Sequence, residues 1–155
     1  MSGLLLAGPA VAQDIPAELA PPAGTALIGT FAAKGVQIYR CAAQGSTLEW
    51  AFKAPEAQLV DAQGKVFLKH YAGPTWEAVD GSKIVGKVMK TAPAPTTGAI
   101  PWLLLSAESS GTGVLATARF VQRVNTAGGV APNGPCPQVD AEQRVPYAAD
   151  YLIYK

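Results

Sequence analysis

Residues 65–83, KVFLKHYAGPTWEAVDGSK, combine two strand signals, a rigid corner and a hairpin turn. Apolar and polar residues alternate in KVFLKHY, so we expect a strand on which Val66, Leu68 and His70 share the side that faces the core or the rim of a cavity. AGP at 72–74 predicts a fixed corner, and the Asp-Gly pair in DGS at 80–82 supplies the positive φ of a tight hairpin. The stretch therefore predicts strand, corner, short strand and hairpin.

The same pattern of short apolar runs and turn residues continues along the chain. Between the runs lie turn-forming segments such as AAKG, AQGS, DAQGK, ESSGTG and NTAGGVAPNGP. Many short runs without a long helical period indicate an all-β protein, which we expect to be an antiparallel β-sandwich or barrel with long loops. The runs span residues 26–31, 35–42, 47–53, 57–61, 65–71, 82–90, 100–107, 114–124 and 147–154.

Composition limits the classes of partner. The chain has 155 residues, of which 49% are hydrophobic, so it can bury the core of one domain. Charged residues are only 15%, while 16 glycines and 13 prolines suit strands joined by turns. With twelve basic and eleven acidic residues, the net charge of +1 offers no surface for a phosphate backbone. We expect no nucleic-acid partner and no cofactor.

The N-terminal residues predict export. MSGLLLAGPAVAQ contains a short apolar run followed by Ala-Val-Ala, the pattern of a signal-peptidase site. We expect residues 1–12 to be the remnant of a signal peptide, 13–25 a proline-rich extended lead segment, and 26–155 a single β domain. No other segment has the ~20 apolar residues of a membrane span. The expected location is periplasmic or extracellular; the alternative is an apolar arm on a cytosolic protein.

The chain has two cysteines, Cys41 and Cys136. In an exported protein the two are expected to form a disulfide, whereas two buried thiols are the alternative. Neither has a histidine or a second cysteine at metal-ligand spacing, so no metal site is predicted.

His70 is the only histidine of the chain and the first candidate for acid–base chemistry. A general base needs a positioned partner, and Glu77 or Asp80 would serve if the chain turns back after the corner. The alternative role for a single histidine at a strand end is structural hydrogen bonding. No G-x-S-x-G elbow accompanies the serines, so a serine nucleophile is not expected.

Trp76 and Trp102 are candidates for binding a small molecule or a carbohydrate, because aromatic side chains flanked by polar groups are common in such sites. Arg123 and Asn125 are candidates for holding a ligand carboxylate. The alternatives are core packing for the tryptophans, and for Arg123 a role in pinning the loop at 125–138 to the sheet. The leading hypothesis is a ligand site near His70, Trp76 and Arg123. An enzyme and a structural envelope or matrix protein without ligand are the rival hypotheses.

Six separated motifs resemble, in order, those of the DUF3455 family of secreted bacterial and fungal proteins. They are GVQIYRC at 35–41, HYAGPTWEAVDGSKIVGK at 70–87, IPWLLL at 100–105, VQRVNTAGG at 121–129, Cys136 and VPYAADYLIY at 145–154. The resemblance implies an extracytoplasmic β-rich domain and no stated activity. The matching positions expected around a shared pocket or corner are His70, Gly73, Pro74, Trp76, Glu77, Asp80, Gly81, Trp102, Arg123, Asn125, Thr126, Gly128 and Gly129.

Overall fold

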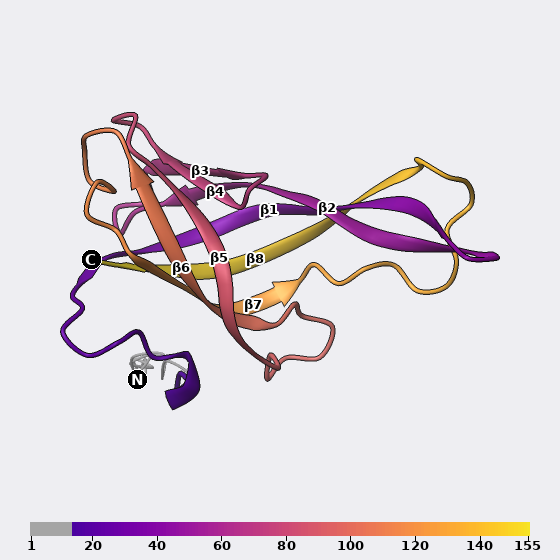
Figure 1. Cartoon of the computed structure of the whole chain (residues 1–155), viewed down its shortest axis with the longest axis horizontal. Helices are drawn as coiled ribbons and strands as arrows, with labels where there is room; N and C mark the ends of the chain where they lie inside the picture. The colour runs from indigo at the N-terminus through magenta and orange to yellow at the C-terminus, as the bar shows by residue number, and fades with distance from the viewer. Residues whose placement is uncertain (1–13) are drawn as a thin grey trace, which may run out of the picture.

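The computed structural model, which describes residues 14–155, is a closed antiparallel barrel of eight strands (Figure 1). Each strand pairs with its sequence neighbours, and β8 pairs with β1 to close the barrel. The expected all-β class is confirmed, and closure decides for the barrel over the sandwich. The strands are β1 Leu27–Gln44, β2 Thr47–Val60, β3 Val66–Tyr71, β4 Thr75–Ala78, β5 Lys83–Ala92, β6 Trp102–Ser110, β7 Phe120–Gly128 and β8 Glu142–Tyr154.

The β1–β2 hairpin is long, and its outer part extends well beyond the other strands together with the start of β8 and the loop before it, as Figure 1 shows. Its pairing continues to the turn between Gln44 and Thr47. Cys41, on the outer part of β1, forms a disulfide with Cys136, which lies in the loop between β7 and β8. The predicted disulfide is confirmed, and it ties the hairpin to that loop.

The barrel interior contains one cluster of apolar side chains, most of which come from alternate positions of the strands. Strand alternation determines which side chains point inward. In the later part of β8, for example, every second residue is buried: Tyr147, Ala149, Tyr151 and Ile153. The buried members of this interior cluster are Phe31, Ala33, Leu59, Leu68, Trp76, Ala78, Ile84, Ile100, Leu105, Leu115, Ala118, Val121, Tyr147, Ala149, Tyr151 and Ile153.

A second apolar cluster forms where the lead segment packs against strands β5 to β8. Leu19, in a short 3-10 turn at Ala17–Leu19, is fully buried against side chains of these strands. Its carbonyl oxygen accepts a hydrogen bond of 2.7 Å from the Gln122 side-chain amide. The part of the lead segment that the structure describes is thus not extended throughout, and it is anchored to the barrel. The cluster comprises Leu19, Ala92, Trp102, Leu104 and Val124, with Ile15, Ala94, Phe120 and Leu152 at its edge.

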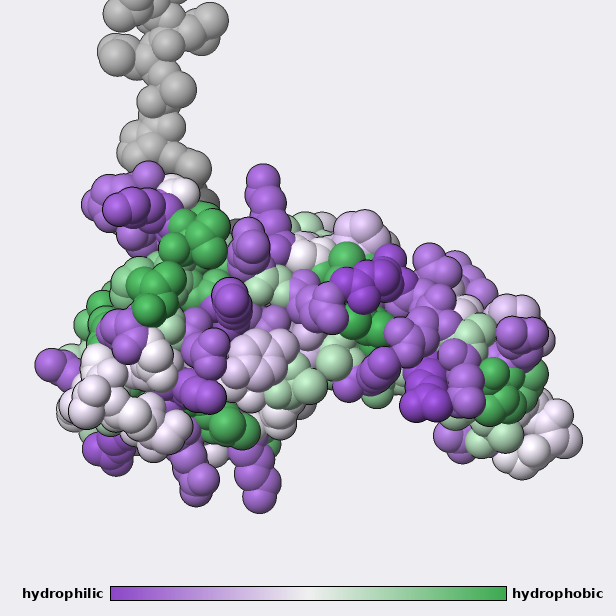
Figure 2. Space-filling model, turned by 90° about the horizontal axis from the view of Figure 1, so that it is seen from above, coloured by the Kyte–Doolittle hydropathy of each residue, from purple (hydrophilic) through white to green (hydrophobic). Residues whose placement is uncertain are grey.

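Polar and apolar side chains are interleaved on the face of the molecule shown in Figure 2. The expected signal-peptide remnant, residues 1–12, lies outside the described residues. Within residues 14–155 no helix has the length and apolar character needed to cross a membrane.

Candidate functional site

The corner after β3 places His70 and Trp76 opposite each other. Gly73 and Pro74 form a cis peptide bond, and the Thr75 hydroxyl donates a hydrogen bond of 2.8 Å to the carbonyl oxygen of Ala72. Gly73 has a φ of 142°, and a Cβ there would lie 2.4 Å from the Thr75 hydroxyl oxygen. A side chain is therefore excluded at this glycine, and the corner turns β3 directly into β4 with His70 paired to Trp76.

The His70 ring is buried, with 4% of its surface exposed. It stacks on Trp76 with ring centroids 4.3 Å apart and lies 5.2 Å from the ring of Tyr151. Its Nδ1 is 2.9 Å from the carbonyl oxygen of Thr75. Because a carbonyl oxygen only accepts, Nδ1 carries the proton and Nε2 keeps its lone pair in the neutral ring.

The pKa of His70 is lowered to about 4. Burial is the main cause; the hydrogen bond to Thr75 opposes it by raising the pKa, and the charge of Arg123 adds a smaller lowering. Desolvation dominates because the imidazolium loses its hydration inside the barrel. His70 is thus neutral at neutral pH.

The two carboxylates proposed as partners of His70 lie elsewhere. Glu77 follows the buried Trp76 in β4 and therefore points to the opposite face, where it accepts a hydrogen bond from the Tyr71 hydroxyl and lies 3.4 Å from the Lys83 ammonium. Asp80 is exposed and closes the hairpin, accepting bonds from the Ser82 backbone and hydroxyl groups. The structure therefore joins His70 to neither carboxylate.

Asp80 has a structural task of its own. Its second carboxylate oxygen accepts a hydrogen bond of 2.8 Å from the Val114 amide, which connects the β4–β5 turn to the β6–β7 loop. These hydrogen bonds, the one from the Ser82 hydroxyl first, lower the pKa of Asp80. The Asp-Gly turn predicted at 80–82 is present, with Gly81 at a φ of 90°.

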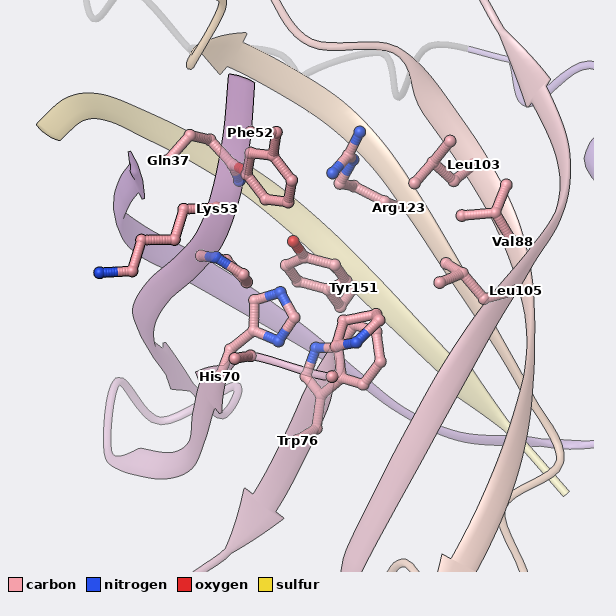
Figure 3. A pocket seen from close by; sticks show the side chains of 14 residues that line it. Gln37, Phe52, Lys53, His70, Trp76, Val88, Leu103, Leu105, Arg123 and Tyr151 are labelled. Atoms are coloured by element: carbon pink, nitrogen blue, oxygen red, sulfur yellow. The ribbon is translucent and has the colours of Figure 1, made fainter. Parts of the chain in front are cut away.

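One end of the barrel interior holds a cavity of about 240 Å³, to which all eight strands contribute side chains (Figure 3). We call it the barrel cavity. It brings together His70, Trp76 and Arg123, three of the residues expected at a common site. Phe52 is 56% exposed and Val88 48%, so the cavity opens between apolar side chains. The lining residues are Gln37, Phe52, Lys53, Pro55, His70, Ala72, Gly73, Pro74, Trp76, Val88, Leu103, Leu105, Arg123 and Tyr151.

Arg123 supplies the charge of the barrel cavity. Its Nε and Nη2 donate to the carbonyl oxygen of Pro101 at 3.0 and 2.8 Å, which fastens the side chain to the start of β6 rather than to the loop at 125–138. Among residues 14–155, no carboxylate lies within salt-bridge distance of Arg123, whereas Lys53 is paired with Glu142 at 2.6 Å.

Two other polar side chains of the lining have unused donors. The Gln37 amide nitrogen and the Trp76 indole nitrogen are buried and have no hydrogen-bond partner among the described residues. The hydroxyl of Tyr151 shares a hydrogen bond of 3.1 Å with that of Tyr147, and burial raises the pKa of Tyr151. Within residues 14–155, no three His, Cys, Asp or Glu side chains are grouped to hold a metal ion.

Trp102 and Asn125 do not line the barrel cavity. Leu103 and Leu105 of β6 line the cavity, so by alternation Trp102 points outward, where it packs in the cluster with Leu19. Asn125 lies in an irregular part of β7 with a φ of 51°, is exposed, and donates a hydrogen bond of 2.8 Å to Asp150.

Gln37, Phe52, Leu103 and Tyr151 were not anticipated at the site. The alternation in YAADYLIY puts Tyr147 and Tyr151 on one face of a strand, so a sequence pattern could have identified Tyr151 as inward-facing. No local pattern singles out Gln37, a buried amide between Val36 and Ile38, because its surroundings come from distant strands.

Acidification is expected to destabilise the fold through His70. The folded pKa of about 4 lies below the ordinary value of 6.5, so the unfolded chain binds more protons between these two pH values. Stability should fall as the pH drops through this window, by about 3 kcal/mol at pH 4 relative to pH 7. Urea unfolding at pH 7, 5.5 and 4 measures this loss, and an NMR titration follows the single histidine.

His70→Gln is the matched control, since its amide keeps a donor for Thr75 but does not titrate. The variant should lose most of the dependence on pH between 6.5 and 4. A His70 signal that titrates near pH 6.5 in the folded protein would contradict the expectation.

A family model described as "Protein of unknown function (DUF3455)" matches residues 22–155. No curated protein and no solved structure matches the chain. The matched range includes every strand and every residue that lines the barrel cavity. The chain therefore belongs to the DUF3455 family, in agreement with the resemblance of its six motifs.

Proposed function

We propose that the protein binds a small organic molecule in the barrel cavity. The observation that carries the proposal is a cavity that is lined by all eight strands and has apolar walls. It also holds an arginine without an acidic partner and two buried donors without a hydrogen-bond partner among residues 14–155. Eight-stranded barrels have interiors just wide enough to be filled by side chains or to hold one small ligand. Concave, mostly apolar sites with a few polar groups are typical of ligand pockets.

The energetics of the lining support binding over a purely structural role. A buried donor without a partner costs roughly 1 to 3 kcal/mol of stability. Among residues 14–155 three buried side chains have such a donor, and two of them, Gln37 and Trp76, line the same cavity, whereas Trp102 lies outside it. A protein selected only for a packed wall has no need to place two such groups and a cation around an open space.

The geometry favours binding over acid–base catalysis by His70. Its Nδ1 is committed to Thr75, its pKa of about 4 keeps it unprotonated near neutral pH, and neither Glu77 nor Asp80 orients it. A general acid or base works best when its pKa is near the working pH. The stacking on Trp76 gives the ring a role as part of the cavity wall.

Export to the periplasm or outside the cell is part of the same proposal. The disulfide between Cys41 and Cys136 persists in oxidising compartments, and the absence of an apolar spanning helix in residues 14–155 is compatible with export. A ligand-binding protein there would capture its ligand from outside the cytoplasm.

Filling the barrel cavity tests the proposal. Protein labelled with ¹⁵N is titrated with single-ring carboxylates, alcohols and amines and with monosaccharides, and the expected shifts are confined to the lining residues. Leu103→Trp places a larger side chain in the cavity wall and leaves less space for a ligand. It should reduce the affinity for any compound that binds by at least tenfold, about 1.4 kcal/mol.

Val85→Trp is the matched control, because Val85 is 47% exposed and does not line the cavity. This variant should bind as the unmodified protein does. The proposal is overturned if no compound shifts the lining residues, or if a folded Leu103→Trp variant retains the affinity.

A further inference from the structure

We propose that the ligand of the barrel cavity is a compact carboxylate with an apolar body of about one ring, whose charge is bound by Arg123. This inference rests on the proposed function and specifies the class of ligand. Charge, donor geometry and volume each support it.

The charge of the lining selects for an anion. Of the charged residues in the described range 14–155, Lys53 and Arg123 line the barrel cavity, and no Asp or Glu does. Lys53 is paired with Glu142 at 2.6 Å, so the guanidinium of Arg123 is the charge of the lining that has no counterion in the described part of the chain. Taking an unpaired charge partly out of water is costly, and an anionic ligand would offset that cost.

The hydrogen bonds of Arg123 leave the group ready for a carboxylate. A guanidinium has five N–H donors, and the carbonyl oxygen of Pro101 takes one from Nε and one from Nη2. The three that remain include both on Nη1 and one on Nη2, the two nitrogens that bind a carboxylate as a fork. Since Pro101 holds the side chain in place, less conformational entropy is lost on binding.

The neutral polar groups favour an acceptor as well. In Figure 3 the side chains of Gln37 and Arg123 and the hydroxyl of Tyr151 lie at one end of the cavity, while His70 and Trp76 lie at the other. The Gln37 amide nitrogen is a buried donor that has no hydrogen-bond partner within residues 14–155. A sugar presents hydroxyl groups that need acceptors as well as donors, and the described lining offers them uncharged acceptors but no carboxylate. The lining thus fits a carboxylate better than a carbohydrate.

The rest of the cavity fits an apolar body. Its walls are Leu103, Leu105 and Val88, with Phe52 at the opening. An apolar protein cavity of about 150 Å³ holds benzene, so a volume of about 240 Å³ has room for one ring with a short carboxylate-bearing chain. One face of Trp76 is covered by His70, so we assign Trp76 a role as wall and donor rather than as a stacking platform.

Affinities for three probes of one shape test the inference: 3-phenylpropanoate, 3-phenylpropanol and 3-phenylpropylamine. Calorimetry and ¹⁵N shifts of the lining residues are expected to show the carboxylate binding at least tenfold more tightly than the alcohol and the amine. A hydrogen bond to a charged group contributes roughly 1.5 to 3 kcal/mol, which corresponds to about 10- to 100-fold in affinity.

Variants separate the role of Arg123 from a general effect on the fold. Arg123→Gln should lower the affinity for 3-phenylpropanoate at least tenfold. The affinity for 3-phenylpropanol should change by no more than about twofold, so the alcohol reports whether the cavity is intact. Lys87→Gln, which removes a charge from an exposed position of β5 outside the cavity lining, should change the affinity for the carboxylate by less than about threefold.

The outcomes distinguish this inference from the proposed function. If the alcohol or the amine binds in the barrel cavity as tightly as the carboxylate, the inference is wrong and the proposed function stands. The inference is also wrong if a folded Arg123→Gln variant loses affinity for the carboxylate and for the alcohol to the same extent. If none of the three probes, and no other compound of the wider panel, shifts the lining residues, the proposed function itself fails.

Discussion

Removal of the Cys41–Cys136 disulfide is expected to lower the free energy of unfolding by about 4.7 kcal/mol. The two cysteines are 95 residues apart, and the bond between them restricts the unfolded chain over most of the barrel sequence. The estimate follows from the entropy of closing a loop of that length. It is a large part of the roughly 5 to 15 kcal/mol that stabilises a typical domain. Urea unfolding of the Cys41→Ala/Cys136→Ala double variant, compared with the oxidised protein, measures the effect.

Reduction of the unmodified protein provides the control, since it removes the bond without changing the side-chain volume. Both forms should lose similar stability, and ligands of the barrel cavity should still bind below the unfolding transition, because neither cysteine lines it. A loss below about 1 kcal/mol in both forms would show that the restricted loop does not govern stability.

Trp76→Ala is expected to destabilise the protein by about 3 to 5 kcal/mol. Trp76 is 1% exposed, and it contacts the rings of His70 and Tyr151. A Cβ at Gly86 would lie only 2.8 Å from its ring, so β5 leaves room for the indole by having no side chain there. Truncation removes these contacts and leaves a void that the strands cannot close. Urea unfolding followed by circular dichroism measures the loss.

Trp50→Ala is the matched control for Trp76→Ala. Trp50 is half-buried on β2, in the part of the hairpin where it pairs with Cys41, and it belongs to neither apolar cluster. Its truncation should cost less than half as much. Equal losses for the two variants would contradict the assignment of Trp76 to the centre of the barrel.

Local patterns predicted the elements around the site. The alternation of KVFLKHY placed Val66, Leu68 and His70 on one side of β3, and the structure buries Leu68 and His70 there. Val66 is 47% exposed, because it lies at the start of β3 beside a register irregularity in the pairing with β2. Asp80 and Gly81 form the predicted turn because their preference for a tight turn is a property of the residues themselves. The two partners of the disulfide could be predicted from the sequence because the chain has only two cysteines.

The same patterns were less informative about Trp102 and Glu77. The run IPWLLL is apolar on both faces, so the sequence does not show which face of this strand points into the barrel. In the structure Leu19 covers the outer face, and Trp102 is buried there, away from the barrel cavity. Glu77 is near His70 in sequence, but alternation about Trp76 turns it to the other side of β4. Closeness along a strand is therefore a poor guide to side chains that share a site.

Composition, alternation, turn residues and the two cysteines were sufficient to predict an all-β domain with one disulfide. The six motifs were sufficient to predict its family. These are properties of single segments, which keep their period of two and their turn preferences in any sheet. The pairing of β8 with β1, by contrast, joins segments more than a hundred residues apart, and no local pattern specifies it. That closure turns the inward faces of the strands toward one another and brings His70, Trp76 and Arg123 from three strands to one cavity.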